Sequence, residues 1–226
     1  MNQEQQKQLS TELNFKLVLL QQRAAVLDEL FLHLSTSVDT ETAEYYVQVM
    51  NRYGNFFNAI IHSLRTSLYI ELLAILGVKL NKNGDVIADR HATASIYNLA
   101  ILSNREDEYL ELVEKHKTDI ALVDKIRHHL AHAATSLDEL NKQHVPGHNR
   151  VVSLLNGLAG FVMTVRDELH GIPGLNKPYL LEDENPYADD TERLISALAL
   201  SSRSEEMRAQ YIKARSKMRK KSEAST

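Results

Sequence analysis

The chain has 226 residues, a formal net charge of −4 and no cysteine. The lack of cysteine excludes disulfides, thiolate metal sites and a cysteine nucleophile, and it fits a reducing compartment. The negative net charge excludes a general attraction to nucleic acid, so an RNA partner would need a local basic patch.

The composition also predicts the fold class and the cellular location of the protein. There are only 8 glycines and 4 prolines, and the long segments are rich in Leu, Ala, Glu, Lys and Gln, which are strong helix formers. We therefore expect an all-α protein. No run approaches the roughly 18 consecutive apolar residues that a membrane span needs, and the polar residues 1–6 do not resemble a secretory signal. We expect a cytoplasmic protein without a membrane partner.

The first two predicted helices are long. Residues 4–34 carry apolar side chains at spacings of three and four, which is typical of a helix with one buried face. A polar segment then ends this helix, and Thr40 can cap the next one, predicted over 41–77. Beyond Tyr53 the second helix is apolar on most sides, which indicates a central position. Residues 81–85, with the sequence Asn-Lys-Asn-Gly-Asp, are expected to form a turn.

Four shorter helices are predicted in the middle of the chain. We expect them over 90–103, from about Tyr109 to near Lys117, over 119–143 and over 149–170. Each has apolar residues at helical spacing, and the third has a clean apolar stripe. The loops between them are short.

Glycines mark the last of these helices. Gly157 and the pair Ala159-Gly160 are small enough to permit a close helix crossing or a kink. Gly171 begins a Gly-Ile-Pro-Gly segment that is expected to terminate the helix. Long helices joined by short loops favour antiparallel packing. The predicted fold is therefore an all-α antiparallel helical bundle over residues 1–171.

Residues 172–226 are predicted to lie outside the bundle. Three of the four prolines fall within 172–190, which indicates an irregular arm, and 189–221 can form a further helix. The end of the chain is basic and is the best local candidate for attracting RNA phosphates. Its candidate RNA-binding residues are Lys213, Arg215, Lys217, Arg219, Lys220 and Lys221.

One six-residue stretch concentrates the potential chemistry of the chain: Arg127-His128-His129-Leu130-Ala131-His132. His128 and His132 are four residues apart and share a helix face, whereas Arg127 lies about 140° around the axis from His132. An arginine fork suits phosphate oxygens, and a histidine can transfer protons near neutral pH. Together they favour metal-independent RNA cleavage, in which the ribose 2′-hydroxyl is the nucleophile. A symmetric dimer could supply two copies to one cleft.

The pattern Arg127-His128-x-x-x-His132 resembles the R-[N/D/H]-x3-H signature of the HEPN superfamily, the higher eukaryotes and prokaryotes nucleotide-binding domains. The second predicted helix looks like that of the abortive-infection (AbiU-type) branch, through Tyr53, Phe56-Phe57, Ser63-Leu64 and Ser67-Leu68. The resemblance covers roughly residues 5–170. It implies a helical bundle, a homodimer with a composite site, and endoribonuclease activity in a toxin or phage-defence system, with an antitoxin as a possible partner. Arg127, His132 and His128 would be catalytic.

Two alternatives remain open from the residues. His128 and His132 could ligate a metal, but candidate further ligands such as His62, His144 and Asp124 have no diagnostic spacing, so we expect neither metal nor cofactor. The chain could instead be a non-catalytic helical module for dimerisation or for RNA or protein binding, since many HEPN-like proteins have lost catalysis. Motif residues from two chains that face one open, positively charged cleft would favour the nuclease. Arg127 paired to a carboxylate, with both histidines covered, would favour the module.

Overall fold

The computed structural model describes five long stretches and a few isolated residues of the chain. These are 3–32, 48–81, 85–89, 92–131, 147–171, 190, 193–194 and 197–198, with the side chains of 31–32, 80, 86 and 128–131 excepted. The contacts divide the chain into two compact units. Unit 1 comprises 1–28 and 60–185, and unit 2 comprises 29–59 and 186–226. The domain boundary predicted at residue 171 stays a prediction.

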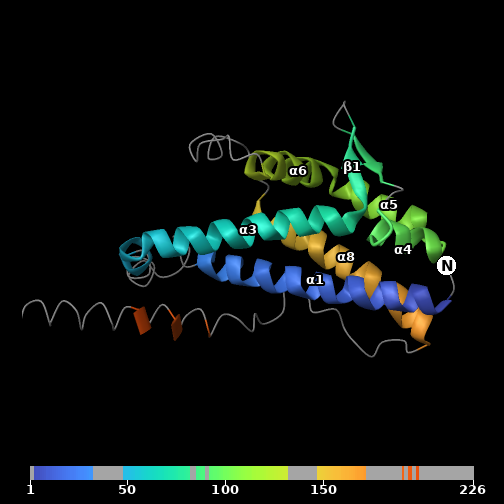
Figure 1. Ribbon diagram of the computed structural model, residues 1–226, viewed down its shortest axis with the longest axis horizontal. Coiled ribbons are helices and arrows are strands. Elements are labelled where there is room, and N and C mark those ends of the chain that lie inside the picture. Colours follow the sequence, from blue (N-terminus) through green and yellow to red (C-terminus); the bar gives the residue numbers. More distant parts are fainter. Residues whose placement is uncertain are drawn as a thin grey trace, which may run out of the picture. The chain divides into compact units, whose positions relative to one another are not determined.

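Unit 1 is built from long helices, which confirms the predicted all-α bundle. Figure 1 shows α8 (His148–His170) lying side by side with the parts of α1 (Gln3–Leu32) and α3 (Gly54–Leu76) that belong to unit 1, with α1 antiparallel to the other two. Cross-helix contacts agree with this arrangement, since Gln21 Nε2 donates to Asn156 Oδ1 at 3.2 Å and Arg23 Nη1 lies 2.6 Å from Glu71 Oε2.

The core of the bundle follows the predicted helical spacing. In α1 the positions at spacings of three and four are buried: Leu9, Leu13, Leu17, Leu20, Ala24 and Leu27. In α8 the side chains of Val151, Leu154, Leu155, Leu158, Phe161, Val162 and Val165 are also buried. Removing such apolar surfaces from water is the main favourable contribution to folding.

The second predicted helix is interrupted, so the single helix expected over 41–77 is wrong at Tyr53. Residues 48–52 are helical, Tyr53 is a turn, and α3 begins at Gly54. The Tyr53 carbonyl accepts hydrogen bonds from Phe56 N at 2.9 Å and from Phe57 N at 3.1 Å, so the backbone forms a tight turn there. Glycine is a poor helix former, which makes the step into α3 a weak point of the helical pattern. Residues 41–47 lie outside the described residues.

A small hairpin follows α3, where the sequence predicted only a turn. Strand β1 (Val78–Leu80) pairs antiparallel with β2 (Val86–Ala88), and Lys79 stands opposite Ile87. Gly77 makes the reversal from helix to strand possible. Its φ of 73° is unfavourable for other residues, and an added Cβ would approach Ser95 Cβ to 2.6 Å.

Three helix starts differ from the predictions, since the helix expected from about Tyr109 also begins earlier, at Glu106. The helix expected over 90–103 is α4 (Ile96–Leu102), because Ser95 caps it by accepting from Asn98 N at 3.2 Å. The next helix, α5 (Glu106–Lys115), begins directly after a short break. The helix expected over 119–143 begins two residues earlier as α6 (Lys117–Ala131), and residues 132–143 lie outside the described ranges.

Helix α8 ends as predicted, and one of its glycines has the predicted packing role. Gly171 adopts a left-handed conformation with φ of 66°, and its N–H bonds to carbonyls of the last turn. At Gly157 an added Cβ would lie 2.7 Å from Leu112 Cδ1. The small residue therefore lets α5 approach α8 closely.

Helix α3 is long and apolar enough to cross a membrane, judged by length and composition alone. A third of its most apolar window, 33%, is buried inside the protein. The core helix of a soluble protein passes the same test, so a single such helix is weak evidence. The expected lack of a membrane partner, like the cytoplasmic location, therefore stays a prediction.

His148 at the start of α8 predicts a pH-dependent stability. Its Nε2–H donates to the Ala24 carbonyl at 3.0 Å, and the ring lies 3.7 Å from Asp28. Burial lowers the pKa of His148 from its usual 6.5, although Asp28 and the Ala24 carbonyl oppose this effect. The unfolded chain then binds more protons than the folded one, so stability is fully present above pH 6.5 and falls as the pH drops below it.

We expect the free energy of unfolding to decrease between about pH 7.5 and pH 5.5, and to decrease less in His148→Gln. Glutamine keeps an N–H donor for Ala24 but does not titrate. Urea unfolding at several pH values measures the slope, and His170→Gln, at an exposed position, is the matched control. An unchanged slope in His148→Gln would contradict this assignment.

Candidate functional site

Helix α6 carries the described part of the predicted motif. Its inner face buries Ile120, Val123 and Ile126, and this stripe orients the helix on the bundle. Arg127 follows the buried stripe, and its side chain is 39% exposed. The guanidinium is therefore accessible to a ligand while its helix is held by the core.

Arg127 forms an ion pair with Asp124 on the same helix. Arg127 Nη2 lies 2.9 Å from Asp124 Oδ1, and the Asp124 side chain is only 16% exposed. A guanidinium has five N–H donors in a planar fork. This contact can therefore hold the arginine in one orientation without using its full bonding capacity.

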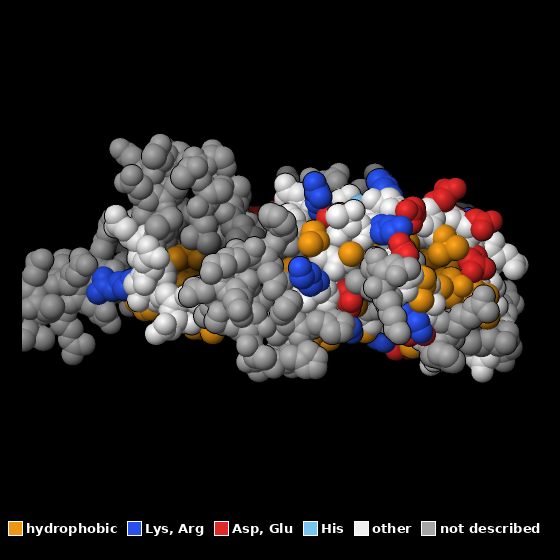
Figure 2. All heavy atoms as spheres, turned by 90° about the horizontal axis from the view of Figure 1, so that it is seen from above, with side chains coloured by type: hydrophobic (Ala, Val, Ile, Leu, Met, Phe, Trp, Pro, Cys, Tyr) orange, Lys and Arg blue, Asp and Glu red, His pale blue; other side chains and the backbone are white. Residues whose placement is uncertain are grey.

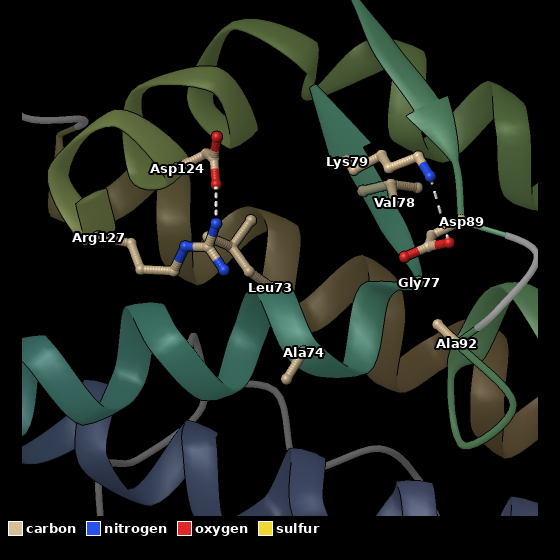
Figure 3. A pocket seen from close by; sticks show the side chains of 9 residues that line it. All are labelled: Leu73, Ala74, Gly77, Val78, Lys79, Asp89, Ala92, Asp124 and Arg127. Carbon is tan, nitrogen blue, oxygen red and sulfur yellow. Dashed lines mark hydrogen bonds and ion pairs between the residues drawn. The ribbon is translucent and has the colours of Figure 1, made fainter. Parts of the chain in front are cut away.

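A cavity of about 440 Å³ lies beside Arg127. Leu73 and Ala74 at the end of α3 form one side of it, and Arg127 and Asp124 enter from α6 (Figure 3). The remaining lining comes from the hairpin and the segment after it: Gly77, Val78, Lys79, Asp89 and Ala92. Apolar and charged groups therefore meet in one space.

The hairpin contributes a second ion pair to this cavity. Lys79 Nζ lies 3.5 Å from Asp89 Oδ1, and the side chains are 52% and 31% exposed, respectively. Asp89 N also donates to the Gly77 carbonyl at 2.8 Å, which fixes the chain after β2. The sequence did not point to Lys79 or Asp89. The β-branched residues on both sides of Asn-Gly are a signal for a hairpin. A hairpin predicted there would have placed Lys79 near the end of α3.

The charges around the cavity are balanced, so it is not the strongly positive cleft that would favour a nuclease. Two cations and two carboxylates line it. Figure 2, which views the protein from above, likewise shows Lys and Arg side chains interspersed with Asp and Glu. The pairing of Arg127 with Asp124 matches one part of the arrangement expected for a non-catalytic module.

The structure does not describe the side chains of the other predicted site residues. The backbone of His128 continues α6, but its side chain is not described, and His132 lies outside the described residues. The six basic residues between Lys213 and Lys221 also lie outside them. Their catalytic and RNA-binding roles stay predictions.

The alternative of a metal site has no support within the part of the chain that the structure describes, where no three His, Asp or Glu side chains converge. Among the candidate ligands, His62 is exposed and lies 3.4 Å from Thr66 Oγ1. Asp124 is paired with Arg127, and His144 is outside the described ranges.

A polar cluster, buried except for the exposed side chain of Arg150, joins α5, α6 and α8. His116 and Asp119 are 6% and 7% exposed, with Nδ1 and Oδ2 3.9 Å apart, and Arg150 Nη1 lies 3.5 Å from Asp119 Oδ1. Burial lowers the pKa of His116, and Lys115 adds to this effect. The cluster connects the start of α6 to the start of α8. It therefore has a structural role, which is to hold these two helices together.

No protein-family model, curated protein or solved structure matches the chain. The resemblance to the HEPN superfamily therefore stays a prediction from the Arg127 motif, its expected place in a helical bundle and the residues of the second predicted helix. The residues around Arg127 are therefore the main basis for assigning a function.

Proposed function

We propose that this protein is a metal-independent endoribonuclease of the toxin or phage-defence kind, active as a homodimer. Arg127 would bind the scissile phosphate, His132 would transfer protons and His128 would assist it. The observation that carries the proposal is the accessible Arg127 guanidinium, which lines a cavity while Asp124 holds it in place.

The proposed chemistry needs only RNA and these side chains. The ribose 2′-oxygen attacks phosphorus as its proton passes to one histidine, and the bond to the 5′-oxygen breaks as that oxygen gains a proton from a second histidine. The products are a cyclic 2′,3′-phosphate and a 5′-hydroxyl. Arg127 would stabilise the extra negative charge on the pentacoordinate phosphorus through charge-assisted hydrogen bonds. A second chain would supply the second proton-transferring group.

A second candidate is a non-catalytic HEPN-like module that dimerises or binds RNA or protein. The Arg127–Asp124 ion pair supports it, because a carboxylate already occupies part of the guanidinium. The balanced charge of the cavity supports it as well. This module would retain affinity for a partner without cleaving RNA.

Cleavage of RNA in the presence of a chelator separates the two candidates. The nuclease should cut single-stranded RNA under these conditions, and His132→Ala should lose roughly a hundredfold or more in rate. His170→Ala, at an exposed position on α8, is the matched control and should cut normally. Equal cleavage by wild type and His132→Ala would contradict the nuclease, and no cleavage with retained binding would favour the module. A monomer in light scattering would contradict the composite site.

A further inference from the structure

The cavity beside Arg127 contains a second basic residue from a different element. Lys79 lies on β1 and Arg127 on α6, and Figure 3 shows them on either side of the cavity with the end of α3 between them. Two cations that line one cavity can both contact phosphate oxygens of a bound strand. Such contacts fix the position and direction of a strand.

The size and walls of the cavity suit one nucleotide. Its volume of about 440 Å³ falls in the range of about 300–1,000 Å³ that is usual for small-molecule sites. Leu73, Ala74 and Val78 provide apolar surface for a base or a sugar. A base within a duplex is stacked and paired, so only an unpaired nucleotide could enter.

Lys79 is available for a phosphate because its present ion pair is weak. The 3.5 Å separation from Asp89 is long, and the Lys79 side chain is 52% exposed. Exposed pairs of this kind contribute little to stability. A phosphate, with several acceptor oxygens, can therefore replace the carboxylate as the partner of the ammonium group.

The two carboxylates indicate which bases would fit. Asp89 and Asp124 would repel a phosphate, but each is a good acceptor for the amino group of a base. Cytosine presents such an amino group at N4, whereas the corresponding atom of uracil is an acceptor oxygen. A carboxylate in the cavity therefore discriminates between two bases of nearly equal size.

We infer that this cavity binds one unpaired nucleotide of RNA, with Lys79 and Arg127 toward its phosphates and the Asp89 carboxylate toward an amino group of its base. The inference rests on the RNA substrate in the proposed function and adds a preference for cytosine over uracil. Lys79 would be a binding residue and not part of the catalytic chemistry.

Binding of an uncleavable strand tests the role of Lys79. The ligand is a fluorescent 2′-O-methyl oligocytidine of about six nucleotides, with chelator present, and anisotropy gives its Kd. Lys79→Gln should weaken binding roughly three- to tenfold and should reduce the slope of log K against log salt by about 0.7. Lys16→Gln is the matched control, because Lys16 also has one carboxylate partner, Glu12, at 2.9 Å. Equal binding by Lys79→Gln and wild type, or an equal loss in the control, would overturn the inference.

The base preference has its own measurement. Wild type should bind oligocytidine about tenfold more tightly than oligouridine of the same length. Asp89→Asn should bind both with higher affinity, because a negative charge is removed, but should lose most of this preference. Equal affinity of the wild type for the two strands, or an unchanged preference in Asp89→Asn, would refute the assignment of Asp89.

These outcomes are separable from the proposed cleavage. The 2′-O-methyl group removes the nucleophile and the strand cannot be cut. Binding through Lys79 is therefore measured whether or not the protein is a nuclease. If RNA is cut but Lys79→Gln binds like wild type, the nucleotide site is wrong and the nuclease stands. If oligocytidine binds through Lys79 but no RNA is cut, the nuclease is wrong and the nucleotide site stands.

Discussion

Replacing Arg127 by alanine is expected to reduce RNA cleavage by about a hundredfold to a thousandfold, which is the usual effect of removing a group that stabilises charge in the transition state. Stability should change by less than about 1 kcal/mol, because the lost contact is a partly exposed ion pair within one helix. Single-turnover cleavage in chelator measures the rate, and thermal unfolding measures the stability. Arg127→Lys should recover only part of the activity, since lysine keeps the charge without the planar fork.

Asp124 and Arg150 give this prediction its controls. Asp124→Asn should increase the affinity for RNA, because it removes the carboxylate that competes with phosphate for Arg127. Arg150→Ala removes another helix-surface arginine paired to an aspartate, but one that does not line the cavity. It should cleave normally. Full activity in Arg127→Ala, or an equal loss in Arg150→Ala, would leave the proposed phosphate site without support.

Tyr109→Ala is expected to cause the largest loss of stability, about 3–5 kcal/mol. The Tyr109 side chain is fully buried, with 0% exposure. Its ring centroid lies 6.0 Å from that of Tyr97 and 5.7 Å from that of Phe161. Truncation would therefore leave a cavity where α4, α5 and α8 meet. Urea unfolding at neutral pH measures the effect, and wild-type stability in Tyr109→Ala would contradict the described packing.

Tyr109→Phe isolates the contribution of the hydroxyl group. The hydroxyl donates to the Leu76 carbonyl at 2.6 Å, and burial raises the pKa of Tyr109 far above its usual value, so the donor stays protonated. Loss of this buried bond should cost about 1–3 kcal/mol. Tyr97→Phe is the matched control, because its hydroxyl contacts the Glu106 side chain in a partly buried setting. An equal or smaller loss in Tyr109→Phe than in Tyr97→Phe would contradict this role.

This hydroxyl also links stability to the candidate site. Leu76 ends α3 directly before Gly77, and Gly77 lines the cavity. The bond from Tyr109 therefore holds the end of the helix from which the hairpin and Lys79 depart. A moderate loss of oligonucleotide affinity in Tyr109→Phe would follow from this connection.

Local pattern predicted much of the fold. The spacing of Leu13, Leu17 and Leu20 predicted the buried face of α1, and Gly171 predicted the end of α8. Both depend on interactions within a few residues of one another, which a sequence displays directly. The interruption at Tyr53 was not predicted, because a hydrophobic pattern continues across a single turn.

The candidate site was predicted only in part. Arg127 was singled out by its residue type and its place on a helix, and it does line a cavity. Asp124, a candidate metal ligand in the sequence, is the partner of Arg127. The sequence does not single out Lys79 and Asp89, because the Asn-Gly segment predicts a turn, and only the hairpin brings both residues to the cavity.

The sequence by itself determined the helical class and the inward faces of the main helices. It also identified Arg127, with the histidines that follow it, as the candidate site. These properties follow from residue type and from spacing along a single helix. Only the tertiary structure decided that Lys79 and Asp89 share a cavity with Arg127, and that the charges there are balanced. Elements far apart in the chain meet because their apolar faces pack together, and that packing selects the neighbours of an exposed side chain without regard to its charge.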